Sequence, residues 1–301
     1  MGPNGFDAGW VERGNGGVLW KSPHGRRLPD WRERTLLMGI VNATPDSFSD
    51  GGRWLEPGAA AEQAERLAAE GADVIDVGAE STRPGGAPVE EEEETARLIP
   101  AIREIRRRLP EIPISADTRK RGPARAAIEA GADILNDVQG GAEPDPRWPS
   151  LAPVAAELGC PWILMHNRAR PHGSDFWGEL LGELAAAARR AEEAGVARSQ
   201  LWLDPGFGFG KTPAENLEAL GRLERVTALG LPVLVGTSRK STLGLVLGEA
   251  DPGRRGPGDA ACAAWSVAGG AAMLRVHDVA AARPVARMAD ALRRGLGWKD
   301  S

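Results

Sequence analysis

Short apolar runs alternate with amphipathic stretches along most of the chain. The apolar runs lie at residues 36–41, 73–77, 112–116, 133–136, 162–165, 201–203, 232–235 and 273–276. Between them, apolar residues recur with helical spacing, most clearly at residues 57–72, 89–109 and 214–230. Strands that are apolar on both faces and are separated by helices are typical of a parallel sheet covered by helices.

The number of these units predicts how the sheet closes. Eight strand–helix units within a chain of 301 residues favour a (β/α)₈ TIM barrel. A doubly wound open sheet is the structural alternative, but no GxGxxG motif follows the first apolar run. We therefore expect an α/β protein with one barrel domain at residues 35–296. Residues 1–34 would form an N-terminal extension that covers the barrel floor or is partly disordered.

Glycines and acidic residues mark the expected helix ends. Gly71, Gly131, Gly195 and Gly230 each follow a helical stretch, where a left-handed residue commonly ends a helix. The acidic run at residues 90–94 is expected to begin a helix, because the helix dipole favours acids there. We predict no catalytic role for that run.

Composition and charge exclude several classes of function. The net charge is -5 and the longest basic run is three residues, at 106–108, so nucleic acid is not an expected partner. No apolar run approaches the roughly 18 residues of a membrane span, and residues 1–34 lack the apolar core of a signal peptide. Cys160 and Cys262 lie apart in apolar surroundings, which predicts buried free thiols and a cytoplasmic protein.

Polar residues follow all eight apolar runs. The carboxyl ends of barrel strands meet at one face, and that face carries the chemistry. Asp117, Asn136 and Asp204 suit the edge of a flat heterocycle that presents several N–H groups. A second set suits phosphate oxygens, and it consists of Asn42, Arg83, Lys240, Arg275 and His277. A Ser-His-Asp order is not evident, so we do not expect nucleophilic hydrolysis.

Two glycine-containing segments differ in what they predict. Residues 42–52, "NATPDSFSDGG", are long for a connection and carry a single aromatic, Phe48, so we expect them to close over bound ligands. Residues 206–211, "GFGFGK", lack the spacing of a phosphate-binding P-loop. For these we expect only a flexible turn.

Seven segments together resemble the motifs of the dihydropteroate synthase family in order and spacing. They are "MGIVNATPDSFSDGG", "DVGAESTRPGG", "ISADTRK", "ILNDVQGG", "LDPGFGFGK", "GTSRKS" and "RVHDV". The resemblance covers about residues 36–295. The chain departs from the family pattern at Ala43, Ala79, Arg119 and Asn167.

The resemblance implies a reaction, a fold and partners. The family joins 6-hydroxymethyl-7,8-dihydropterin diphosphate to 4-aminobenzoate, giving 7,8-dihydropteroate and pyrophosphate on the route to folate. It implies a (β/α)₈ barrel, a Mg²⁺ cofactor, small-molecule substrates and a homodimer, and sulfonamides target the family.

The resemblance also implies roles for individual residues. The pterin site would contain Asp117, Asn136, Met165, Asp204, Lys240 and Arg275. Asn42, Arg275 and His277 would hold the diphosphate, with Asn42 on the magnesium ion. The aminobenzoate site would contain Phe48, Thr82, Arg83, Pro84 and Ser241. The catalytic residues would be Asp117, Lys240, Arg275 and His277, which would favour a pterin cation or neutralise the departing pyrophosphate.

Two other functions remain open from the sequence. A pterin-dependent methyltransferase has a similar barrel and would share the pterin acceptors, but it has no use for "STRPG" or "SRKS". A non-catalytic pterin-binding homologue would have lost the diphosphate residues, whereas Asn42, Arg275 and His277 are present.

Overall fold

Eight parallel strands form the centre of the structure. The computed structural model describes residues 20–43, 57–80, 89–140, 147–169 and 171–295. Each predicted apolar run overlaps one observed strand. The strands are β1 (Leu36–Asn42), β2 (Val74–Gly78), β3 (Ile114–Asp117), β4 (Ile134–Asp137), β5 (Trp162–Met165), β6 (Leu201–Asp204), β7 (Leu234–Val235) and β8 (Met273–Val276).

The strands close into a barrel, as predicted. Their order in the sheet is β6-β5-β4-β3-β2-β1-β8-β7. The two ends of that sheet meet through a parallel bridge between Leu203 and Val233. The open doubly wound alternative is therefore excluded, and the carboxyl ends of all eight strands face the same end of the barrel.

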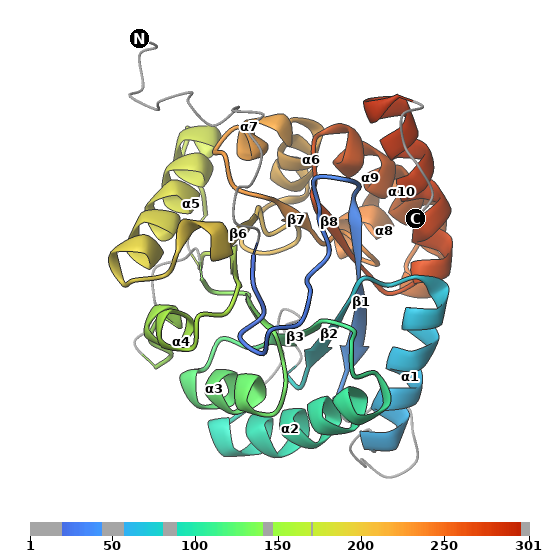
Figure 1. Cartoon of the computed structure of the whole chain (residues 1–301). Coiled ribbons are helices and arrows are strands. Elements are labelled where there is room, and N and C mark those ends of the chain that lie inside the picture. Colours follow the sequence, from blue (N-terminus) through green and yellow to red (C-terminus); the bar gives the residue numbers. More distant parts are fainter. Residues whose placement is uncertain (1–19, 44–56, 81–88, 141–146, 170, 296–301) are drawn as a thin grey trace.

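Helices surround the strands, as Figure 1 shows. The α-helices are α1 (Pro57–Glu70), α2 (Glu91–Arg108), α3 (Arg121–Glu129), α4 (Ala152–Leu158), α5 (Phe176–Glu193), α6 (Pro213–Gly221), α7 (Glu224–Thr227), α8 (Ser241–Leu247), α9 (Gly256–Ala268) and α10 (Val279–Arg294), with 3₁₀ turns η1 (Arg198–Gln200) and η2 (Pro252–Arg254). The single helical stretch expected at residues 214–230 is divided into α6 and α7. The division lies at Arg222, where φ is -131° and ψ is 42°.

Helix ends follow the sequence signals. Gly71, Gly131, Gly195 and Gly230 all have positive φ, as the predicted left-handed ends require. The acidic run begins α2, as predicted. Glu94 is fully buried and pairs with the ammonium of Lys120.

Residues 20–34 lie across the floor of the barrel (Figure 1). In Figure 1 this segment, dark blue, crosses the end of the barrel at which the strands begin. Trp20 and Leu28 belong to the same buried cluster as Met38 and Trp202 inside the barrel. The rings of Trp20 and Trp202 lie 4.5 Å apart between centroids. Residues 1–19 lie outside the described residues.

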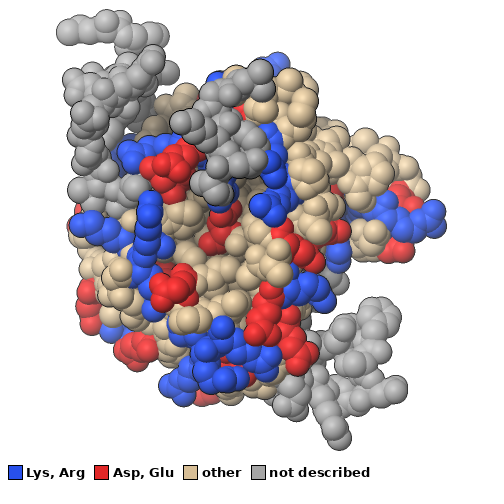
Figure 2. All heavy atoms as spheres, turned by 45° about the vertical axis from the view of Figure 1, so that its right-hand side comes forward, with Lys and Arg blue, Asp and Glu red and all other residues tan. Residues whose placement is uncertain are grey.

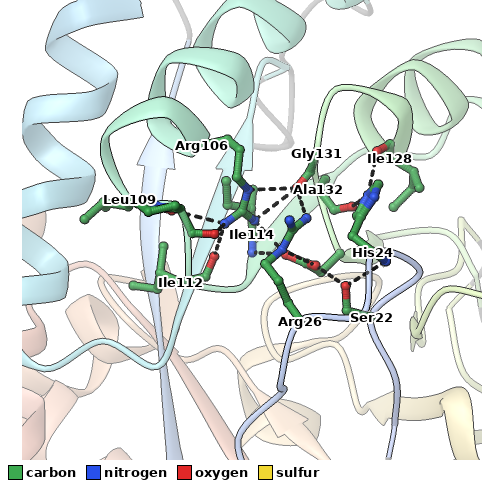
Figure 3. A network of polar contacts seen from close by, with 12 residues as sticks. Ser22, His24, Arg26, Arg106, Leu109, Ile112, Ile114, Ile128, Gly131 and Ala132 are labelled. Carbon is green, nitrogen blue, oxygen red and sulfur yellow. Dashed lines mark hydrogen bonds and ion pairs between the residues drawn. The ribbon is translucent and has the colours of Figure 1, made fainter.

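A buried carboxylate fixes this segment to the barrel. Asp133 accepts hydrogen bonds from Arg26 Nε at 2.9 Å, from Arg106 Nη2 at 2.8 Å and from the Ile114 amide at 3.0 Å, and Ser22 Oγ also donates to it. Figure 3 shows how these donors converge from the extension, α2 and β3. The Asp133 side chain is fully buried, so each donor offsets part of its desolvation.

The surface carries both signs of charge. On the face shown in Figure 2, basic and acidic side chains are intermixed and neither forms a continuous field. No helix in the described part of the chain is long and apolar enough to cross a bilayer. Cys160 is buried, as predicted, whereas Cys262 is only half-buried, and both thiols are free.

Candidate functional site

Three of the predicted acceptors lie at the carboxyl ends of their strands, at the same end of the barrel. Asp117 ends β3, Asn136 lies in β4 and Asp204 ends β6. Asp117 pairs with Asn136 in register, so these side chains are neighbours. All three are at least nine-tenths buried. Separate strands, rather than a local turn, therefore build this polar group.

A cationic side chain joins this group from β8. Arg275 Nε donates to Asp76 Oδ2 at 2.6 Å, and Arg275 Nη2 donates to Asp117 Oδ2 at 2.7 Å. Asn136 Nδ2 also donates to Asp76, at 3.2 Å from the same Oδ2 and at 3.4 Å from Oδ1. Asp76 thus lies beneath the site and orients both Arg275 and Asn136.

Burial raises the pKa values of two carboxylates in this group. Burial raises the pKa of Asp117 to about 7, although the charge of Arg275 opposes the shift. Burial likewise raises the pKa of Asp204 to about 6, against the hydrogen bond from the Gly206 amide. Asp117 Oδ1 is buried and has no hydrogen-bond partner among the described residues. That oxygen is available to accept from the N–H of a ligand.

Lys240 approaches the same group from the loop after β7. Burial, followed by the charge of Arg275, lowers the pKa of Lys240 to about 8, while Asp204 and Asp117 oppose the shift. Its Nζ lies 3.9 Å from the ring centroid of Phe209. A lysine that lies over a ring face, within the field of two carboxylates, suits binding of a planar, hydrogen-bonding ligand.

The glycine-rich turn at residues 206–211 is more than the flexible connection that we expected. Lys211 Nζ donates to His166 Nδ1 at 2.9 Å, to Gly206 O at 3.2 Å and to Phe209 O at 3.1 Å. A Cβ at Gly206 would lie 1.9 Å from His166 O, so only glycine fits there. Lys211, which is half-buried, fixes the turn that presents Phe209 to Lys240.

His277 and Asn42 lie at neighbouring strand ends. His277 Nδ1 is 3.1 Å from Ser238 Oγ, and the His277 side chain is partly exposed. Asn42 ends β1 and is exposed at the barrel mouth. Within the described residues there is no cluster of three or more His, Cys, Asp or Glu side chains that could hold a metal ion.

The remaining predicted residues divide into two sets. Met165 is buried at the end of β5 beside Asp204, and Ser241 begins α8 directly after Lys240. Both therefore lie at the expected end of the barrel. The other predictions lie outside the described residues, and they concern Phe48, Thr82, Arg83 and Pro84.

Sequence reasoning missed two buried groups that support the site. Asp76 could have been found, because it is an acid within the apolar run 73–77. Lys120 is fully buried behind the site, where it donates to Glu80 Oε2 at 2.7 Å and also pairs with Glu94. Arg119, one of the departures from the family pattern, also donates to Glu80, at 2.8 Å. No local pattern distinguishes Lys120 from a surface lysine.

Comparison with known proteins gives one consistent result. A family model described as pterin binding enzyme matches residues 38–277. The chain is 43% identical to dihydropteroate synthase of Synechocystis sp., covering 90% of this chain and 95% of that protein. It is 44% identical to dihydropteroate synthase of Bacillus subtilis, covering 87% of this chain and 90% of that protein.

Solved structures agree with the sequence comparison. Dihydropteroate synthase of Xanthomonas albilineans with 4-aminobenzoic acid superposes with a TM-score of 0.81 at 43% identity, covering 87% of this chain and 94% of that chain. The same enzyme in complex with 7,8-dihydropteroate gives a TM-score of 0.78 at 41% identity, with the same coverage of both chains.

Proposed function

The chain belongs to the pterin binding enzyme family, and from this premise we infer that it is active as a dihydropteroate synthase. It condenses 6-hydroxymethyl-7,8-dihydropterin diphosphate with 4-aminobenzoate, and it releases 7,8-dihydropteroate and pyrophosphate. The observation that carries this conclusion is the identity of 43% over 90% of the chain to a relative of that name. The group formed by Asp117, Asn136, Asp204, Lys240 and Arg275 supports it.

The geometry suggests how these residues act on the pterin. The free Asp117 Oδ1 and the carboxylate of Asp204 would accept from the ring N–H groups, and Asn136 would complete that edge. Met165, beside Asp204, would line the pocket. As the C–O bond to pyrophosphate lengthens, the pterin carries positive charge, which the two carboxylates stabilise in a closed site.

Arg275 and His277 are assigned to the departing pyrophosphate. Two of the three guanidinium nitrogens of Arg275 are held by Asp76 and Asp117, so Nη1 would meet the diphosphate. The two carboxylates, which outweigh the effect of burial, raise the pKa of Arg275, so it stays charged. His277 lies two residues further on and would donate to the same oxygens. Lys240 is assigned to the pterin site, and Ser241, the next residue, to the aminobenzoate site.

The donor set fits a magnesium ion that is held mainly by substrate. Asn42 offers an exposed amide oxygen, and Mg²⁺ typically combines few protein oxygens with phosphate oxygens and water. When bound, the ion would neutralise charge on the diphosphate. Calorimetry of pyrophosphate binding with and without Mg²⁺, in the wild type and in Asn42→Ala, measures this contribution independently of turnover.

An apolar face supports the expected homodimer. Leu217 of α6, Leu245, Val246 and Leu247 of α8, and Trp265 of α9 are between 45% and 66% exposed. These three helices pack against one another, so the side chains form one face, which we name the α6/α8/α9 face. A second copy of the chain would cover it through a two-fold contact. The two free thiols are consistent with a cytoplasmic location.

One assay tests the main conclusion. Pyrophosphate release should require both the pterin diphosphate and 4-aminobenzoate. Release that needs only the pterin diphosphate would indicate a hydrolase, and tight pterin binding without release would indicate a non-catalytic homologue. Methyl transfer from a folate in the absence of pyrophosphate release would indicate the methyltransferase alternative.

A further inference from the structure

Arg239 has an unusual backbone conformation directly beside the site. Among the described residues it is the only one other than glycine with positive φ, at 59°. L side chains rarely adopt this region, and a residue stays there only when its surroundings hold it. Because Lys240 follows immediately, the conformation of Arg239 decides where the Lys240 side chain points.

Two side chains at the start of α9 hold this residue on both sides. Asp259 Oδ1 accepts from the Arg239 amide at 2.9 Å. Arg255 Nη1 donates to the Arg239 carbonyl at 2.8 Å and to the Lys240 carbonyl at 3.3 Å. The amide and the carbonyl of the strained residue are therefore both fixed by the same short segment.

Arg255 is buried and held in place by further contacts. It is 8% exposed, and its Nη2 donates to Ala250 O at 2.7 Å. The guanidinium passes over Gly244 in α8, where an added Cβ would lie 2.6 Å from Nε, from Nη2 and from the backbone oxygen of Glu249. The glycine at this position therefore leaves room both for Arg255 and for the Glu249 carbonyl that accepts from its Nε.

Asp259 is also linked to His277 through the hydroxyl group of Ser238. Ser238 Oγ donates to Asp259 Oδ2 at 3.3 Å and lies 3.1 Å from His277 Nδ1. An ionised carboxylate can only accept, so the Ser238 proton points toward Asp259 and Oγ accepts from Nδ1. One carboxylate is therefore linked to the turn that carries Lys240 and to the imidazole of His277.

We propose that Asp259 and Arg255 are positioning residues for the reaction. They hold residues 238–240 in the strained turn that directs Lys240 toward Asp117 and Asp204, and Asp259 orients His277 through Ser238. Neither is assigned a contact with substrate. This inference rests on the proposed synthase activity, because it concerns the placement of two residues assigned to that site.

Steady-state pyrophosphate release at varied pterin diphosphate, well below the melting temperature, tests the proposal. Asp259→Ala and Gly244→Ala should each lower kcat/KM by about tenfold or more, since small misplacements of reacting groups are costly. Asp259→Asn keeps an oxygen for the Arg239 amide and should recover part of that loss. Matched controls are Asp175→Ala, which removes a comparable cap of Gly178 at the start of α5, and Gly221→Ala, where an added Cβ meets nothing within 4 Å.

The outcomes separate this proposal from the proposed function. A wild type that releases no pyrophosphate would refute the synthase activity itself. An active wild type, with Asp259→Ala and Gly244→Ala matching their controls in kcat/KM, would overturn the positioning role. Lower melting temperatures with unchanged kcat/KM would overturn it as well. If Asp259→Ala does not fold, Asp259→Asn and Gly244→Ala decide between the same outcomes.

Discussion

The guanidinium of Arg275 and the carboxylate of Asp117 meet at the mouth of the barrel, with Nη2 donating to Oδ2 at 2.7 Å. The two residues lie on β8 and β3, which β1 and β2 separate in the sheet, so the curvature of the barrel brings them together. The contact occupies one carboxylate oxygen and leaves Oδ1 buried without a partner. Asp117 is therefore oriented by the protein and still has an acceptor for a ligand.

Replacing Asp204 should impair the reaction and spare the fold. Asp204→Asn can keep the acceptor for the Gly206 amide, which donates to Oδ1 at 2.7 Å, so the turn stays intact. The new NH₂ would face the N–H donors of the pterin, and the charge that stabilises its cation is lost. This costs about 2–4 kcal/mol. We expect kcat/KM to fall at least about thirtyfold. Turnover near that of the wild type would show that Asp204 only caps its turn and does not act in the reaction.

The raised acid pKa values predict how stability depends on pH. Asp117 titrates near 7 when folded, against 3.8 as the ordinary value, and Asp204 near 6. Between the ordinary and folded values the folded state binds more protons than the unfolded state, so stability falls as pH rises. Without ligand, the melting temperature should decrease from about pH 5 to pH 7.

Asp117→Asn isolates this effect from other titrating groups. The variant lacks the carboxyl group whose pKa is raised. Its free energy of unfolding, relative to that of the wild type, should therefore increase as the pH rises through the same window. Asp137, also buried with a pKa raised to about 7, offers the matched variant Asp137→Asn. A difference between Asp117→Asn and the wild type that is constant with pH would contradict the raised pKa.

The barrel and much of the site could be predicted because both follow local rules. Each strand is a short apolar run, and the residue after it lies at the catalytic end of the barrel, as Asp117 and Asp204 do. Residues whose role depends on distant partners could not be predicted in this way. Asp259 looks like an acid in the first turn of a helix, and Lys120 like a surface lysine. Only the packing of α9 on the loop after β7, and of α2 on α3, gives them partners.

The floor network should contribute to stability and not to turnover. Asp133→Asn leaves Arg26 and Arg106 facing an amide in a fully buried position. Removing one partner of a buried pair costs about 3–5 kcal/mol. We expect a much lower denaturation midpoint with kcat/KM unchanged at low temperature. Asp30→Asn removes the more exposed contact with Arg32 and should cost little. Equal effects of the two variants would show that residues 20–34 are not fixed through Asp133.

The α6/α8/α9 face gives a direct test of the homodimer. Val246, which is 60% exposed on α8, would lie within a two-fold contact between two copies of this face. Val246→Glu places two like charges in that contact, where neither can be solvated, so the variant should sediment as a monomer at concentrations at which the wild type is a dimer. Leu292 of α10 is 76% exposed and lies outside the face, so Leu292→Glu should leave the dimer intact. Analytical ultracentrifugation across a concentration series distinguishes the two variants. If only Leu292→Glu dissociates the dimer, the interface lies on α10 instead. A wild type that is monomeric at every concentration would refute the dimer.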